Sequence, residues 1–104
     1  MVEQVKKFLK EHPNAVIQFH RPSCPFCVYV APLYKAAQEK YADHVAFLLV
    51  DITHDAKNLK NEFGFSTVPE FQYYKDGIKS HAHGSKSRTL KLSDIEALIQ
   101  ELYL

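Results

Sequence analysis

The sequence contains little of several residue types, and each shortage excludes a class of protein. Its 104 residues include no Trp, three Gly and two Cys. Two Cys are too few for a cysteine-rich secreted scaffold or for a zinc site with four thiolate ligands. Neither sign of charge is in excess, because 13 Lys and Arg stand against 12 Asp and Glu. This balance argues against a nucleic-acid-binding protein, which concentrates positive charge on one face.

Long apolar runs are also missing. The longest one, Val45 to Val50, is far shorter than the roughly 20 residues of a membrane-spanning helix. The opening residues, Val2 to Lys10, are amphipathic and charged, unlike a signal peptide. We therefore expect no membrane association and a cytoplasmic location. The apolar share of 46% suffices for the core of a single domain over residues 1–104, and we expect a monomer.

Hydrophobic periodicity and turn signals predict elements in the order α-β-α-β-α-β-β-α. Gly64 is a plausible helix end, Asp76-Gly77 is typical of a hairpin turn, and Ser93 with Glu96 has the spacing of a capping box. The expected elements are a helix from Val2 to Glu11, a strand from Ala15 to His20, a helix from about Pro25 to Tyr41, a strand from Val45 to Asp51, a short helix around Ala56 to Phe63, strands from Glu70 to Lys75 and from Ile78 to His83, and a last helix around Ile95 to Leu102.

This order predicts an α/β fold. The first two strands are joined through a helix, so they should be parallel with a right-handed crossover, whereas the last two should form an antiparallel hairpin. A central mixed four-stranded sheet with helices on both faces follows. Pro32 lies inside the second helix and should kink it.

The run Cys24-Pro25-Phe26-Cys27 is the most specific chemical signal in the chain. Two residues between cysteines at a helix start bring the sulfurs close enough to bond. Cys24 is at the helix N-terminus, where unpaired N–H groups and the helix dipole favour a thiolate and should lower its pKa. Cys27 lies one turn further along and should be less exposed. The spacing thus predicts an attacking thiol and a resolving thiol for thiol–disulfide exchange.

The cysteine pair has two further interpretations. It also fits two inert thiols, or half of a metal site completed by histidines, since His81 and His83 lie on one face of a predicted strand. The pair follows a buried strand and opens a helix, and this position favours redox chemistry without a metal or another cofactor.

Over nearly its whole length the sequence resembles thioredoxin and its relatives. The shared features are the strand from Ala15 to His20, the cysteine motif, Pro32, the Gly64 to Pro69 loop, the Lys75-Asp76-Gly77 hairpin and Gly84. The resemblance implies a thioredoxin-like fold with a cis Val68–Pro69 bond that faces the cysteines. It also implies that the backbone of Val68 pairs with an extended substrate peptide, and that Gly84 lets this peptide approach closely.

The sequence departs from the family pattern around its cysteines. Ser23 stands where thioredoxins have Trp, and the Pro25-Phe26 pair is closer to the glutaredoxin pattern. Phe26 is therefore a candidate apolar contact for the substrate, and ordinary packing at the start of the helix is the alternative. The first strand of the thioredoxin fold is expected to be absent, because the sequence before the first helix leaves no room for it.

A second departure concerns proton transfer. Thioredoxins carry a buried Asp that helps to deprotonate the resolving thiol, and a Lys that partners it. Gln18 and Phe47 occupy the matching positions here, so the usual proton relay for Cys27 is missing. The proton of Cys27 must leave through water or to another group.

Two charged or titratable residues near the motif have two interpretations each. Arg21 either contacts a carboxylate of glutathione or is a solvated charge in a loop. His20 either lowers the pKa of Cys24 or is a partly buried residue at the end of a strand. The stretch from Gly84 to Thr89 lacks the Gly-Gly and Asp pair that glutaredoxins use for glutathione.

The sequence as a whole predicts a thiol–disulfide oxidoreductase that reduces or exchanges disulfides of protein substrates. A glutathione-linked reductase and a thioredoxin-fold module that binds peptides without catalysis are the alternatives. The electron donor is expected to be a reductase or glutathione. The assigned residues are Cys24 as nucleophile, Cys27 as resolving thiol, and Phe26, Val68, Pro69 and Gly84 as substrate-binding residues.

Overall fold

The computed structural model describes residues 1–85 and 88–104. Within these ranges the elements follow one another in the predicted order. They are α1 (Val2–Glu11), β1 (Ala15–His20), α2 (Pro25–Tyr41), β2 (Ala46–Asp51), α3 (Ala56–Phe63), β3 (Glu70–Lys75), β4 (Ile78–Gly84) and α4 (Leu92–Tyr103).

The strands form one mixed sheet in the order β2-β1-β3-β4. β1 and β2 are parallel, with Ala15 opposite Ala46 and His20 opposite Asp51. β3 is antiparallel to both β1 and β4. The prediction of a four-stranded mixed sheet is therefore confirmed, and the chain passes from the carboxyl end of β1 directly to α2.

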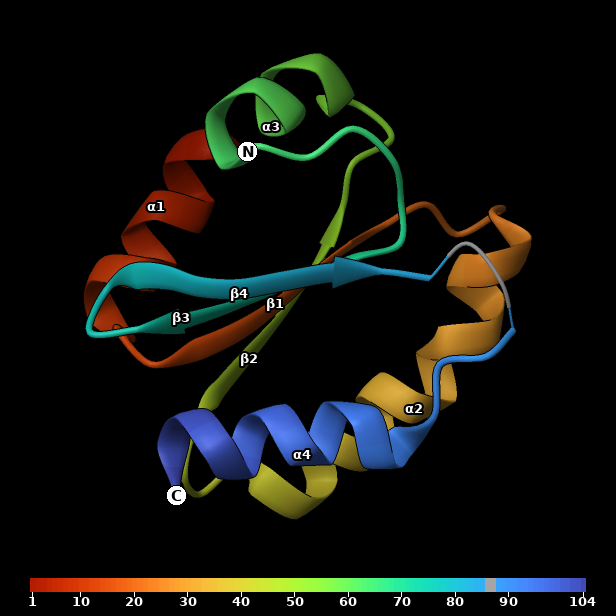
Figure 1. Ribbon diagram of the computed structural model, residues 1–104. Helices are drawn as coiled ribbons and strands as arrows, with labels where there is room; N and C mark the ends of the chain where they lie inside the picture. Colours follow the sequence, from red (N-terminus) through yellow and green to blue (C-terminus); the bar gives the residue numbers. More distant parts are fainter. Residues whose placement is uncertain (86–87) are drawn as a thin grey trace.

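Helices cover both faces of the sheet, with α1 and α3 on one face and α2 and α4 on the other (Figure 1). Alternate side chains of β1 point to opposite faces, as the strand geometry requires. Ile17 and Phe19 are buried with α1 and α3, whereas Val16 is buried with α2 and α4. Gln18 shares the face of Val16, and it is a polar side chain only 1% exposed.

Two predicted strand boundaries differ from the structure by one residue, whereas the position of Pro32 agrees with it. β2 starts at Ala46 rather than at Val45, because the N–H of Val45 instead donates to the carbonyl of Tyr41 at 3.1 Å. β4 extends to Gly84, one residue beyond the expected end. Pro32 lies inside α2 as predicted, and the helix changes direction along its length in Figure 1.

The predicted cap of the last helix is wrong. α4 begins at Leu92, so Lys91 is its N-cap residue and Asp94 occupies the third helical position. The Asp94 carboxylate accepts a hydrogen bond from the Lys91 N–H at 2.9 Å. Ser93 and Glu96 have capping-box spacing, but both lie inside the helix.

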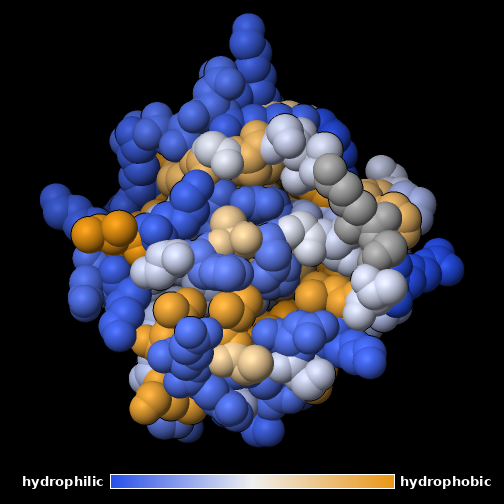
Figure 2. Space-filling model, in the orientation of Figure 1, coloured by the Kyte–Doolittle hydropathy of each residue, from blue (hydrophilic) through white to orange (hydrophobic). Residues whose placement is uncertain are grey.

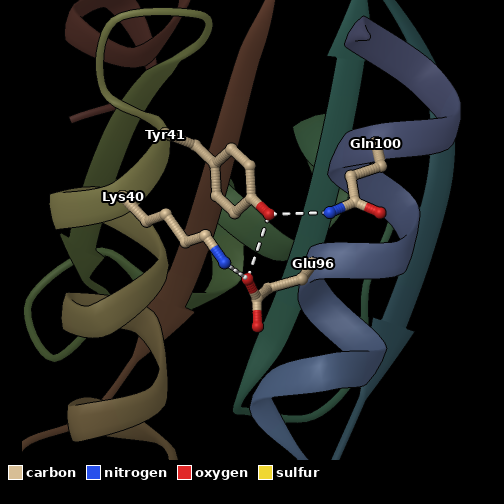
Figure 3. A network of polar contacts seen from close by, with 4 residues as sticks. All are labelled: Lys40, Tyr41, Glu96 and Gln100. Carbon is tan, nitrogen blue, oxygen red and sulfur yellow. Dashed lines mark hydrogen bonds and ion pairs between the residues drawn. The ribbon is translucent and has the colours of Figure 1, made fainter.

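Glu96 instead connects α4 to α2 (Figure 3). Its carboxylate accepts hydrogen bonds from Lys40 Nζ at 2.7 Å and from the Tyr41 hydroxyl at 3.0 Å. The Gln100 amide donates in turn to the Tyr41 hydroxyl oxygen at 2.9 Å. This network fixes the far end of α2, away from its cysteine-bearing first turn.

The hairpin between β3 and β4 turns at Asp76 and Gly77, which both have positive φ angles, 55° and 81°. Two positive φ values are typical of the type I′ turn that matches the twist of a hairpin. The N–H of Gly77 donates to the Pro13 carbonyl at 2.9 Å, and the N–H of Asp76 donates to Asn14 Oδ1 at 2.9 Å. The turn is therefore attached to the loop that precedes β1.

The surface that contains β4 is largely hydrophilic, and apolar atoms gather mainly in the lower half of the view, around α4 (Figure 2). In residues 1–85 and 88–104, no helix has the length and apolar character needed to cross a membrane.

Candidate active site

The cysteine motif forms the junction between β1 and α2. Cys24 is the N-cap residue of α2, and Pro25 follows in the first helical turn, where a missing N–H costs no helical hydrogen bond. Cys24 Sγ accepts a hydrogen bond from the Cys27 N–H at 3.4 Å. Both thiols are free. The sulfur of Cys24 thus lies where the helix presents its unpaired N–H groups.

The surroundings of Cys24 favour its thiolate. Partial burial alone would raise the pKa of Cys24, but hydrogen bonds from the Cys27 side chain and from the backbone of Cys27 and Phe26 outweigh it. The positive charge of Arg21 acts in the same direction. The net effect is a pKa below the ordinary value of a thiol, as the helix position predicted.

Cys27 has the opposite character. It is only 3% exposed. Burial raises its pKa to about 11, with further contributions from its hydrogen bond to Cys24 and from the negative charge that Cys24 acquires. Cys24 is the more exposed and more acidic thiol, and Cys27 is the protected one.

The loop before β3 faces Cys24. The Val68–Pro69 peptide bond is cis. The Cys24 thiol lies 3.9 Å from the Val68 carbonyl oxygen and can donate to it. Pro69 is buried and Val68 is half-buried.

Gly84 lies on the other side of this loop. It is the β4 partner of Glu70, the residue after Pro69. A Cβ atom at Gly84 would approach the Pro69 carbonyl oxygen to 3.2 Å, closer than most real Cβ contacts. Gly84 therefore allows β4 to pass close to the cis-proline.

The structure brings most of the predicted site residues together. Cys24, Cys27, Val68, Pro69 and Gly84 form one connected site through the contacts above. Phe26 is half-buried in the first turn of α2 beside them. Their assignment to catalysis and substrate binding is a prediction that the geometry permits.

Two features of the site were only partly visible in the sequence. The charge of Arg21 acts on both thiols. Tyr34 lies two helical turns after Cys27, and both residues line one cavity with Gln18 and His20. The spacing of seven residues places Cys27 and Tyr34 on the same helix face, so this neighbour could have been found from the sequence.

The histidines proposed as further metal ligands have other contacts. His83 Nε2 lies 2.9 Å from the Tyr73 hydroxyl, and its ring stacks on Phe71 with centroids 4.9 Å apart. Within the part of the chain that the structure describes, no group of three or more His, Cys, Asp and Glu side chains could hold a metal ion.

The stretch from Gly84 to Thr89 was compared above with the glutathione-binding pattern of glutaredoxins. Two of its residues, Lys86 and Ser87, lie outside the described residues.

The chain matches the family model "Thioredoxin" over residues 2–101. It is 35% identical over 77 residues to a thioredoxin H-type of Chlamydomonas reinhardtii, a match that covers 74% of this chain and 67% of the algal protein. It is also 33% identical over 75 residues to protein disulfide-isomerase A2 of Pongo abelii. That match covers 70% of this chain but only 14% of the isomerase.

The fold is likewise similar to solved structures. One such structure is a chain of the ferredoxin:thioredoxin reductase and thioredoxin f2 complex. It matches with a TM-score of 0.79 and 28% identity, over 95% of this chain and 87% of that one. The four-stranded sheet and flanking helices described above are thus the arrangement of a thioredoxin-like fold.

Proposed function

Because the chain belongs to the thioredoxin family of thiol–disulfide oxidoreductases, we propose that it reduces or exchanges disulfides of protein substrates through Cys24 and Cys27. The observation that carries this proposal is the asymmetry of the two thiols. Cys24 is accessible at a helix N-terminus with a lowered pKa, whereas Cys27 is buried with a raised pKa. Thiol–disulfide exchange by a dithiol needs this division of roles.

The reaction follows in two steps. The Cys24 thiolate attacks one sulfur of the substrate disulfide, a Cys24–substrate bond forms, and the other substrate sulfur leaves as a thiolate and takes up a proton. Cys27 then loses its proton and attacks Cys24 Sγ. The Cys24–Cys27 disulfide forms, and the second substrate sulfur leaves as a thiolate. Two electrons pass from the dithiol to the substrate.

The substrate is proposed to bind as an extended segment along the loop of Val68 and Pro69. The Val68 carbonyl faces the Cys24 sulfur, so a peptide that pairs with the Val68 backbone would hold its disulfide near the nucleophile. Gly84 lies close to the Pro69 carbonyl of this loop and presents no side chain to the peptide. Phe26 is half-buried in the helical turn that contains the cysteines, and its ring is proposed to contact the substrate.

The oxidised pair must be reduced again. The structural relative in complex with ferredoxin:thioredoxin reductase supports a reductase protein as the electron donor. Glutathione is the alternative donor, and the charge of Arg21 beside Cys24 favours it because glutathione is an anion.

Two single variants test the proposed roles. Cys27→Ser should accumulate a covalent adduct with a disulfide-containing protein, because the first step proceeds and the second cannot. Cys24→Ser should form no adduct and reduce no substrate. Mass spectrometry of the adduct and a turnover assay measure both outcomes.

The same variants separate the alternatives. A double Ser variant that still functions fully would contradict the redox proposal and support a peptide-binding module. A Cys27→Ser variant that continues to reduce glutathione mixed disulfides would identify glutathione as the donor, since that route needs one thiol.

A further inference from the structure

A cavity of about 420 Å³ lies beside Cys27, between the sheet and α2. β1 contributes Gln18 and His20 to its lining, α2 contributes Cys27 and Tyr34, and β2 contributes Phe47. These include the two positions where thioredoxins carry the acid and the lysine of their proton relay, here Gln18 and Phe47. The cavity therefore occupies the place of the missing relay.

Two buried polar atoms of this lining are unsatisfied. Gln18 Oε1 and the Tyr34 hydroxyl have no hydrogen-bond partner among the described residues. Gln18 is 1% exposed and Tyr34 is 5% exposed. Leaving such groups unpaired in the protein interior destabilises the fold. Water that enters the cavity would supply both partners, and the volume is ample for several molecules.

His20 lines the same cavity and is half-buried. It pairs in register with Asp51 of the parallel strand β2, so the two side chains lie on the same face of the sheet. Burial lowers the pKa of His20, and the Asp51 carboxylate partly opposes this effect. The imidazole is thus a free base near pH 7, with a carboxylate beside it to stabilise the imidazolium.

We propose that His20 accepts the proton of Cys27 through water held in this cavity, in place of the buried acid of other thioredoxins. The inference rests on the proposed function. In the second step, Cys27 gives its proton to a cavity water, which passes a proton to neutral His20. The resulting Cys27 thiolate attacks Cys24 Sγ, and the departing substrate thiolate takes up a proton from the imidazolium through solvent. His20 returns to its neutral form, and no electrons pass through it.

Several other titratable groups face the cavity or His20. α2 contributes Lys35 as well as Cys27 and Tyr34, and β2 contributes Asp51 beside His20. β3 and β4 contribute none of the residues that line the cavity. Burial raises the pKa of Tyr34 well above the neutral range, so its hydroxyl can orient water but stays protonated. His20 is the cavity-lining base that can accept a proton near pH 7.

The test separates the two chemical steps with dithiobis-nitrobenzoate, a disulfide whose leaving thiolates are coloured. Attack by Cys24 releases the first thiolate, and attack by Cys27 releases the second. In His20→Asn the first release should keep its rate, whereas the second should slow by about tenfold or more at pH 7, because a general base contributes typically 10²–10⁴-fold. His44→Asn, an exposed histidine outside this cavity, is the matched control.

The pH profile of the second release is the decisive readout. In the native chain its rate should fall as pH drops through the lowered pKa of His20, which protonates the acceptor. In His20→Asn the rate should instead rise steadily with pH toward the pKa of Cys27, about 11, and approach the native rate in alkali. Adding Gln18→Glu to His20→Asn places an acid in the cavity and should restore much of the second release near neutral pH.

Two outcomes overturn the inference: an unchanged second release in His20→Asn, or an equal slowing in His44→Asn. Tyr34→Phe is a further variant that keeps the ring but removes a water-binding group, and it should slow only the second release. If it leaves that release unchanged while His20→Asn fails to fold, the water-mediated route is contradicted. If the native chain releases no first thiolate, Cys24 does not attack the disulfide, and the proposed function itself is contradicted.

Discussion

At the scale of single residues, the chemistry depends on how two thiols three residues apart acquire different acidities. Cys24 has hydrogen-bond donors in the first turn of α2 and the charge of Arg21, whereas Cys27 is enclosed. The difference is a consequence of position, because the unpaired N–H groups of the first turn point toward the N-cap residue Cys24, whereas the Cys27 side chain is buried.

The role of Arg21 can be tested through the reactivity of Cys24. In Arg21→Gln the pKa of Cys24 should rise, because one favourable charge for the thiolate is lost. Alkylation of Cys24 by iodoacetamide at pH 7 should slow by roughly twofold, and added salt should reduce the difference because the charge is screened. The pH profile of alkylation in the Cys27→Ser background measures this change.

Lys10→Gln is the control for net charge. It removes the same charge from the last turn of α1, and Lys10 is not among the groups that shift the pKa of Cys24. An unchanged alkylation profile in Arg21→Gln, or an equal change in Lys10→Gln, would contradict a local effect of Arg21.

At the scale of elements, the hairpin β3–β4 holds one side of the site. Its turn at Asp76 and Gly77 is bonded to Pro13 and Asn14, so the hairpin and the start of β1 are fixed together. A Cβ atom at Gly77 would meet nothing within 4 Å, and its φ is 81°. Any cost of a side chain at Gly77 therefore arises from the backbone conformation alone.

Gly77→Ala should lower the free energy of unfolding by about 1 kcal/mol, because L-residues disfavour the left-handed region. Urea denaturation measures the loss. Asp76→Asn is the control and should stay within about 0.5 kcal/mol, since Asn also tolerates positive φ. Equal stability of the native chain and Gly77→Ala would be inconsistent with the turn described here.

The elements were predictable where local patterns determine them. Helical spacing, short apolar runs and the Asp76-Gly77 pair predicted the helices, strands and hairpin with small errors at their ends. The cap of α4 was not predictable in this way, because Ser93 and Glu96 have capping-box spacing. The carboxylate of Glu96 instead meets Lys40 and Tyr41, more than 50 residues earlier in the chain. Contacts over that separation leave no local pattern.

At the scale of the whole molecule, the fold brings together residues from three distant segments. Cys24 follows β1, Val68 precedes β3 and Gly84 ends β4. The spacing of the two cysteines and their place at a predicted helix start predicted them as a site, but Val68, Pro69 and Gly84 came from the resemblance to thioredoxin. The cavity beside Cys27 was not predictable at all, since it depends on how α2 lies over β1 and β2.

The same arrangement predicts the redox character of the molecule. A lowered pKa of Cys24 stabilises the dithiol form, because the thiolate is a better leaving group and a more stable anion. The replacement of the family's buried acid by Gln18 and the Pro25-Phe26 sequence between the cysteines add to the expectation of a more oxidising pair than that of thioredoxin itself.

The reduction potential of the Cys24–Cys27 pair tests whether the two thiols act as a redox pair, and it is measured by equilibrating the chain in defined thiol buffers. We expect a single two-electron transition between dithiol and internal disulfide, at a potential above the value of about −270 mV of thioredoxin. If no internal disulfide forms at any poise of the buffer, Cys24 and Cys27 do not act as a redox pair, and the proposed function is wrong.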